Sequence, residues 1–164
     1  MGAVQLNTGT VRVTSAVDVV SARSPVSSLL ARPAVTIDAG ATLAEAVAAM
    51  EAAEVSALLV EGPAGIVTER DIARALGHGV SVDQPVGHVA TRHPIAVPGR
   101  MPVVEACALM LNEQVRHLVV DVEGRLGVVS LRDVAAAMLQ ATDPHIWLAS
   151  LRVAIDVPTE NWLG

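Results

Sequence analysis

A seven-residue pattern occurs twice in this chain of 164 residues, and it constrains the fold more than any other feature. The first copy, at residues 65–71, reads GIVTERD, and the second, at residues 127–133, reads GVVSLRD. A glycine followed by two apolar residues is typical of a short buried strand, and the hydroxyl residue after them is typical of a helix N-cap. The pattern therefore predicts a strand that passes directly into a helix, once in each half of the chain.

The two copies belong to a longer internal repeat. A shift of 60 residues places Arg32 on Arg92 and Met50 on Met110, and a two-residue insertion then changes the shift to 62. A register held over roughly 50 residues indicates two copies of one structural unit. The predicted boundaries are an N-terminal arm at 1–23, a first unit at 24–79, a second unit at 83–141 and a C-terminal extension at 142–164.

Hydrophobic periodicity predicts the order strand, helix, strand, strand, helix in each unit. Thr42, followed by Glu45 three residues later, has the capping-box spacing of a helix start. The expected strands are 35–37, 57–60 and 65–67 in the first unit and 95–97, 118–120 and 127–129 in the second, and the closing helices are 69–76 and 131–138. A βαββα unit covers only one face of its sheet. We therefore predict an α/β (α+β) fold, in which two such units pack about a pseudo-two-fold axis and leave two equivalent clefts between them.

The segments outside the repeat give weaker signals. Residues 10–14 alternate in polarity, so a short strand in an ordered arm and a floppy tail both stay open. Asp143 and Pro144 indicate the start of another helix, but residues 153–157 alternate, so a change to strand near Arg152 is equally compatible. An apolar extension of this kind packs either on the core or on a second subunit, and we expect the second, because large exposed apolar tails are unfavourable and symmetric dimers are the commonest oligomers.

Composition limits the classes of function. The net charge of −6 argues against a nucleic-acid-binding protein, which normally carries a basic patch. No stretch reaches the roughly 18 uncharged apolar residues that a membrane span needs, and no signal-peptide pattern is visible, so we expect a cytoplasmic protein. The single cysteine, Cys107, lies in an apolar helical pattern, which favours a packed core thiol.

Each repeated motif places an aspartate on the first turn of a helix. An ionised carboxylate accepts two hydrogen bonds, which fits the adjacent hydroxyls of a ribose. The helix N-terminus, the hydroxyl residue and the arginine can all bond phosphate oxygens. The same pattern also arises as an ordinary helix cap without a ligand. The residues concerned are Thr68, Arg70 and Asp71 in the first motif and Ser130, Arg132 and Asp133 in the second.

The motif, written as Gly, two apolar residues, Thr or Ser, any two residues and Asp, resembles the nucleotide-contacting motif of cystathionine-β-synthase-type (CBS) domains. The resemblance covers about residues 24–141 and implies a tandem pair, or Bateman module, that binds an adenosyl ligand such as AMP, ADP, ATP, S-adenosylmethionine or NAD. It assigns one motif to each cleft. It also assigns the first strand of each unit to the wall around the base, which here means Val35, Thr36, Ile95 and Ala96.

The resemblance further implies a phosphate contact from the basic pair Arg116 and His117, which precedes a strand of the second unit. The first unit has Ser56 and Ala57 at these positions, so the two clefts are expected to differ in phosphate affinity. The chain contains no Phe and no Tyr, and both tryptophans lie outside the repeats. We therefore expect aliphatic side chains, rather than an aromatic ring, to hold an adenine.

The leading hypothesis is a regulatory module that binds an adenine nucleotide or a related adenosyl ligand between its repeats and forms a homodimer, as the resemblance implies. The sequence leaves open whether the module also binds another protein. The alternative is a structural or protein-interaction module with no physiological small-molecule ligand. We do not expect an enzyme, because the sequence shows no Ser-His-Asp arrangement, no paired carboxylates and no Gly-rich phosphate loop. The five histidines show no metal-ligand spacing.

Overall fold

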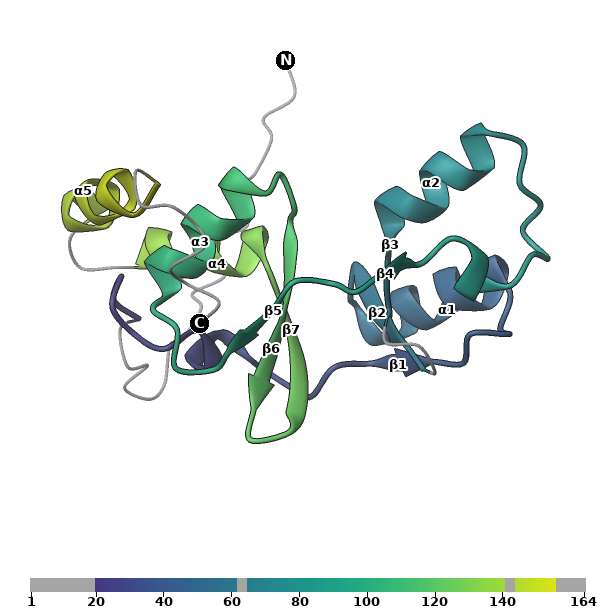
Figure 1. The fold of residues 1–164 in the computed structure, drawn as a ribbon, viewed down its shortest axis with the longest axis horizontal. Helices are drawn as coiled ribbons and strands as arrows, with labels where there is room; N and C mark the ends of the chain where they lie inside the picture. Colours follow the sequence, from purple (N-terminus) through teal and green to yellow (C-terminus); the bar gives the residue numbers. More distant parts are fainter. Residues whose placement is uncertain (1–19, 62–64, 141–143, 156–164) are drawn as a thin grey trace, which may run out of the picture.

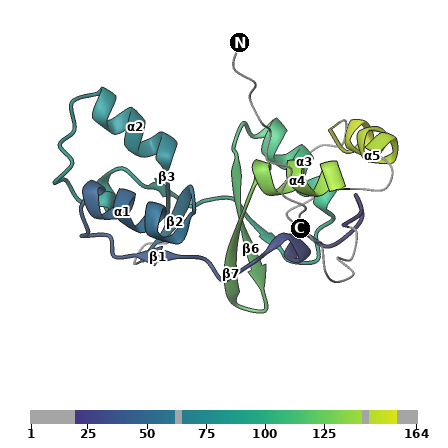
Figure 2. The ribbon, with the colours of Figure 1, turned by 180° about the vertical axis from the view of Figure 1, so that it is seen from behind.

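The protein folds into two α/β units, as seen in a computed structural model that describes residues 20–61, 65–140 and 144–155 (Figure 1). Each unit has its own sheet, with its helices packed beside that sheet, and Figure 2 shows the same two halves from behind. The expectations for residues 10–14 and for Val157 fall outside the described residues. The α+β class that the sequence predicts is confirmed.

The first unit contains a four-stranded sheet in the order β1-β2-β3-β4. Its elements are β1 (Thr36–Ile37), α1 (Leu43–Ala53), β2 (Ala57–Val60), β3 (Gly65–Thr68), α2 (Glu69–Gly77) and β4 (Thr91–Arg92). β1 runs parallel to β2, and the other pairs are antiparallel. The predicted capping box at the start of α1 is present, since the Glu45 carboxylate accepts from the Thr42 backbone N–H at 2.7 Å and the Thr42 hydroxyl accepts from Glu45 N–H at 3.1 Å.

The second unit repeats this arrangement with a three-stranded sheet in the order β5-β6-β7. Its elements are β5 (Ala96–Pro98), α3 (Val103–Asn112), β6 (His117–Val122), β7 (Arg125–Ser130) and α4 (Leu131–Gln140). β5 is parallel to β6, and β6 is antiparallel to β7, as in the first unit. The predicted order of strand, helix, strand, strand, helix is therefore confirmed in both units.

The segment that leads into each unit packs on the other unit. The 3-10 helix η1 (Val26–Leu29) precedes the first repeat, yet Val26 is buried in the core of the second unit. The 3-10 helix η2 (Val86–His88) precedes the second repeat, yet Val86 is buried in the core of the first. β4 likewise pairs with β3 of the first unit. This exchange of lead-in segments was not predicted from the sequence, and it ties the two units together.

The exchange obeys the pseudo-two-fold relation. Pro25 forms an isolated bridge with Pro102, and Pro85 forms the equivalent bridge with Thr42, one repeat apart.

The two sheets also meet face to face through a small apolar cluster, made of Ala57, Leu59, Ile66 and Val119. Gly127, the first residue of the second motif, lies so close to Leu30 of the exchanged segment that a Cβ atom there would collide with the leucine.

The described part of the C-terminal extension is the helix α5 (Pro144–Ile155), which continues past Arg152 and so excludes a change to strand at that residue. Trp147 is 2% exposed and Ala154 is 7% exposed, and both belong to the core that contains α3. The expectation that the extension packs on a second subunit is therefore wrong for this face of α5. Apolar residues spaced four and seven positions apart form a stripe along the helix, and this stripe packs on α3 of the same chain. None of the described helices has the length and apolar character of a membrane span.

Candidate functional site

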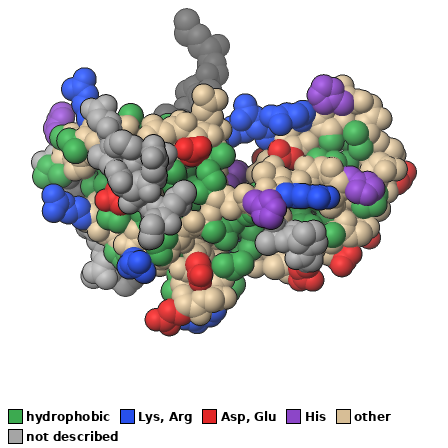
Figure 3. All heavy atoms as spheres, in the orientation of Figure 1, with side chains coloured by type: hydrophobic (Ala, Val, Ile, Leu, Met, Phe, Trp, Pro, Cys, Tyr) green, Lys and Arg blue, Asp and Glu red, His purple; other side chains and the backbone are tan. Residues whose placement is uncertain are grey.

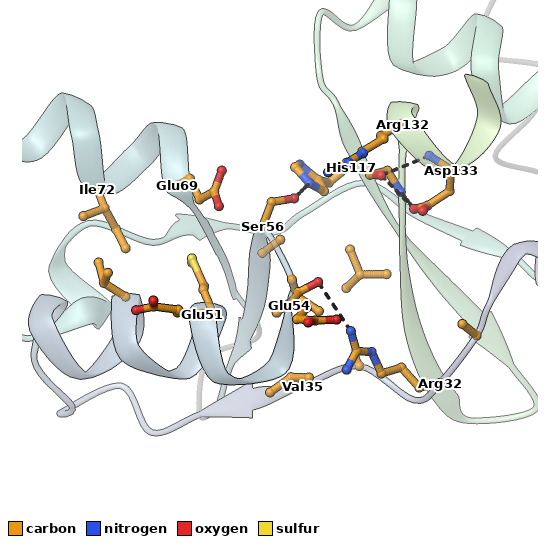
Figure 4. Close-up of a pocket in the computed structure, with 18 of the residues that line it drawn as sticks. Arg32, Val35, Glu51, Glu54, Ser56, Glu69, Ile72, His117, Arg132 and Asp133 are labelled. Atoms are coloured by element: carbon orange, nitrogen blue, oxygen red, sulfur yellow. Dashed lines mark hydrogen bonds between the residues drawn. The ribbon is translucent and has the colours of Figure 1, made fainter. Parts of the chain in front are cut away.

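Two clefts lie between the units, and both include Ser56 and His117 in their walls. Cleft 1, with a volume of about 990 Å³, also contains residues of α1, α2 and the second motif (Figure 4). Cleft 2, of about 390 Å³, contains the first motif and the segment that precedes β6. On the face shown in Figure 3, a hollow separates the two units, and basic side chains of the first unit border it. The molecule therefore offers two adjoining concave sites, with Asp133 of the second motif in cleft 1 only and Asp71 of the first motif in cleft 2 only.

Ten of the twelve residues that the sequence assigns to a ligand line these clefts. Val35 and Asp133 lie in cleft 1 only; Thr68, Arg70, Asp71, Ile95 and Arg116 lie in cleft 2 only; His117, Ser130 and Arg132 line both. Thr36 and Ala96 line neither cleft. They follow Val35 and Ile95 directly, and successive strand residues face opposite sides of a sheet. The Thr36 hydroxyl instead donates to Glu61 at 2.8 Å.

Both motif aspartates cap their own helices. In the first motif, Asp71 Oδ2 accepts from the Thr68 hydroxyl at 2.6 Å and from the Thr68 backbone N–H at 3.0 Å. In the second motif, Asp133 Oδ2 accepts from the hydroxyl and from the N–H of Ser130, both at 2.7 Å. Within the described residues these bonds use only Oδ2, so each Oδ1 can still accept from a ligand hydroxyl. The helix cap and the ribose contact are therefore compatible functions of one carboxylate.

His117 lies between the two motifs. Its Nε2 atom forms a hydrogen bond of 2.9 Å with the Ser56 hydroxyl, which Figure 4 shows at the junction of the units. Burial and the neighbouring Arg116 lower the pKa of His117, while Asp133, Asp71 and Glu69 oppose this shift. The aspartates of both motifs thus act on the pKa of one imidazole, which lines both clefts.

The family model for the CBS domain matches residues 26–78 and again residues 86–140. This chain belongs to the CBS-domain family. The match supports the tandem CBS pair that the repeated motif suggested, and the solved structures that resemble the chain include CBS-domain pairs.

Three relatives show how far the similarity of this CBS pair extends. A 17.7 kDa protein of Acidianus ambivalens is 33% identical over 120 residues, which are 70% of this chain and 73% of that protein. A CBS domain-containing protein of Arabidopsis thaliana is 36% identical over 122 residues, which are 71% of this chain but 22% of the plant protein. A CBS domain protein from Pyrobaculum aerophilum, solved in complex with AMP, is 31% identical with a TM-score of 0.64, and the match covers 79% of this chain and 98% of that one.

The two clefts of this CBS pair differ strongly in charge. Cleft 2 contains four arginines and two carboxylates, a formal excess of two positive charges with histidine neutral. Cleft 1 contains two arginines and four carboxylates, which is the opposite excess. The basic residues of cleft 2 are Arg70, Arg74, Arg116 and Arg132; the acidic residues of cleft 1 are Glu51, Glu54, Glu69 and Asp133.

Four cleft residues were not predicted from the sequence, although signals for three of them were present: Glu51, Glu54, Glu69 and Arg74. Arg74 follows Arg70 by four residues, so both lie on one face of α2. The 60-residue shift of the repeat aligns Glu51 with Leu111 and Glu54 with Gln114. An alignment of the two units outside the motif would therefore have revealed the charge difference. Within the part of the chain that the structure describes, no group of three His, Cys, Asp or Glu side chains could hold a metal ion.

Proposed function

We propose that this CBS pair is a regulatory module that binds an adenine nucleotide in cleft 2, with AMP as the first candidate. The observation that carries the proposal is the set of four arginines around the first motif, Arg70, Arg74, Arg116 and Arg132. Together with two carboxylates they leave a net positive cleft, which favours a phosphate. The AMP complex of the Pyrobaculum aerophilum protein, which is 31% identical, supports the same ligand class.

The proposed contacts follow from the residues in place. Asp71 Oδ1 accepts from a ribose hydroxyl, while Oδ2 keeps the helix cap. The N-terminus of α2 and its arginines face the phosphate, because the helix dipole and the guanidinium groups both favour an anion. Aliphatic side chains form the wall for the base, among them Ile66, Pro94, Ile95 and Val115. None of these contacts breaks or forms a covalent bond, so the proposed module has no catalytic role.

Regulation requires that the ligand bind two states of the protein with different affinity. The clefts lie between units, so a nucleotide in cleft 2 contacts both the first motif and the Arg116 segment of the second unit. We propose that occupancy adjusts how the units meet and that a homodimer passes this change on. Exposed apolar residues of α4 and α5 support the dimer: Leu139 is 84% exposed, Val153 is 68% exposed and Leu148 is 48% exposed.

Titration calorimetry with AMP tests the proposal. Asp71→Asn keeps an acceptor for the helix cap but removes the charge, and it is expected to weaken AMP binding by about tenfold or more. Glu113→Gln, an exposed change on the α3 side that lines neither cleft, is the matched control and is expected to bind AMP like the unchanged protein. Folded protein that takes up no AMP at millimolar concentration would contradict the proposal and favour the protein-interaction alternative.

A further inference from the structure

The helices of the second unit carry a third helix that those of the first unit lack. α5 packs on α3, and no described helix lies at the corresponding place on α1 and α2 (Figure 1). Trp147 and Ala154 of α5 belong to the same buried core as residues of α3. The Asn112 side chain at the end of α3 donates to the backbone carbonyl of Ile155 at 3.4 Å. The extension thus covers the helices of the second repeat.

The repeat shows which surface stays uncovered in the first unit. The 60-residue shift aligns Val47 of α1 with Cys107 of α3, and Ala44 with Val104. Cys107 is 6% exposed and Val104 is 7% exposed, whereas Val47 is 47% exposed and Ala44 is also exposed. Leu76 of α2, which is 42% exposed, extends this surface and lines cleft 1 together with Val47. The first unit therefore has an apolar groove between α1 and α2, the α1/α2 groove, where the second unit is covered by α5.

α5 has a second apolar stripe on a different side from the one that packs on α3. Val153 is 68% exposed, and Ala149, four residues before it, is also exposed. Ile146 is 61% exposed and precedes Ala149 by three residues, so the three side chains share one face of the helix. α5 can therefore pack on α3 through one stripe and present the other to a second molecule.

The stripe and the groove are complementary in charge. α1 carries two glutamates and no basic residue, and one of them, Glu51, lies four residues after Val47 and lines the same cleft. The twelve residues of α5 include Arg152 and no carboxylate. Within the described residues, neither the Glu51 carboxylate nor the Arg152 guanidinium makes a hydrogen bond or an ion pair. Packing α1 on α1 of a second copy would instead bring two acidic helices together.

We infer that α5 of one copy docks in the α1/α2 groove of a second copy, so that the second unit of each chain lies against the first unit of the other. The contact occurs twice and closes a two-fold dimer, because each copy contributes one α5 and one groove. The inference rests on the proposed function only for the existence of a homodimer, and it goes beyond that function by naming the two surfaces. Since Val47 and Leu76 line cleft 1, the partner's α5 completes the wall of that cleft.

Charge reversal tests the contact without changing its apolar residues. Arg152→Glu and Glu51→Arg are each expected to raise the dissociation constant of the dimer about tenfold or more, because each places like charges at both contacts. The variant with both substitutions restores opposite charges, and its constant is expected to return to within about threefold of the original. Arg125→Glu, a reversal at an exposed strand residue outside both surfaces, is the matched control and is expected to change nothing. Sedimentation over a concentration series, without ligand, measures these constants.

Cross-linking identifies what occupies the groove. The single cysteine, Cys107, is buried, so a cysteine introduced on the surface supplies the reactive thiol. A short bis-maleimide is expected to join Val47→Cys protein to differently tagged Val153→Cys protein and to join neither variant to itself. Val82→Cys, at a residue 46% exposed between α2 and η2, replaces Val47→Cys in the control and is expected not to react with Val153→Cys.

The outcomes separate this inference from the proposed function. Cross-linking of Val47→Cys to itself would overturn the inference in favour of a dimer through α1, and cross-linking of Val153→Cys to itself would overturn it in favour of a dimer through α5. A dimer that neither single charge reversal weakens also contradicts the inference, while the nucleotide site in cleft 2 stands. A monomeric unchanged protein removes both the inference and the proposed dimer, and the AMP titrations still decide the ligand of cleft 2.

Discussion

His117 is the residue on which both clefts converge. Burial and Arg116 lower its pKa in the folded protein, against the opposing effect of Asp133, Asp71 and Glu69. The unfolded chain therefore binds more protons than the folded protein below the ordinary histidine pKa of about 6.5. The free energy of unfolding should fall as the pH drops from about 6.5 toward the lowered pKa, and it should be fully retained above neutral pH. Urea unfolding between pH 7.5 and 5 measures this dependence.

His117→Gln should flatten that pH dependence, since glutamine does not titrate and can still bond the Ser56 hydroxyl. His78→Gln is the control, because His78 is exposed at the end of α2 and lines neither cleft. An equal slope in the unchanged protein and in His117→Gln would show that the buried imidazole contributes nothing to the pH dependence of stability.

The sequence indicated His117 through its place before a strand. Its hydrogen bond to Ser56, however, joins residues that are 61 positions apart, and no local pattern encodes such a contact.

At the scale of elements, the sequence predicted what depends on local periodicity. The helices and the strands of each repeat lie close to their expected ranges, because apolar spacing and capping residues act within a few residues. β4, with two residues, and the exchange of η1 and η2 were missed, since they depend on which distant strand or core is adjacent. The acidic wall of cleft 1 was missed for the same reason: Glu51 and Glu54 enter the site only when α1 faces α4.

The exposed apolar residues of α4 and α5 lead to a prediction about dimer formation. Leu139 and Val153 are large apolar residues that the chain leaves exposed, although Trp147 of α5 is buried. If this surface joins two copies, Leu139→Ser together with Val153→Ser should convert a dimer into a monomer in sedimentation experiments at micromolar concentration. Val82→Ser, at a residue 46% exposed between α2 and η2, should leave the mass unchanged. A monomeric unchanged protein would refute the proposed dimer.

At the scale of the whole molecule, the exchanged lead-in segments decide whether the two repeats are independent. Each unit needs a segment from the other repeat to complete its core, namely η1 for the second unit and η2 for the first. The sheets also share an apolar cluster at their contact. Neither repeat as read from the sequence therefore contains a whole core. The clefts lie between these interlocked units, so ligand sites and folding cooperativity have one structural origin.

This interlocking predicts a single unfolding transition. Val26 and Val86 are both fully buried, one in each core, and replacing either by alanine should lower the free energy of unfolding by about 2 kcal/mol. With Trp162 replaced by Phe, so that the fluorescence comes from Trp147 of the second unit, both substitutions should lower the stability seen by this fluorescence and by amide exchange in α1 and β2 of the first unit to the same extent. Val153→Ala, at a residue 68% exposed, should change the stability by less than about 0.5 kcal/mol. If Val86→Ala destabilises only the first unit, the units fold separately despite the exchange.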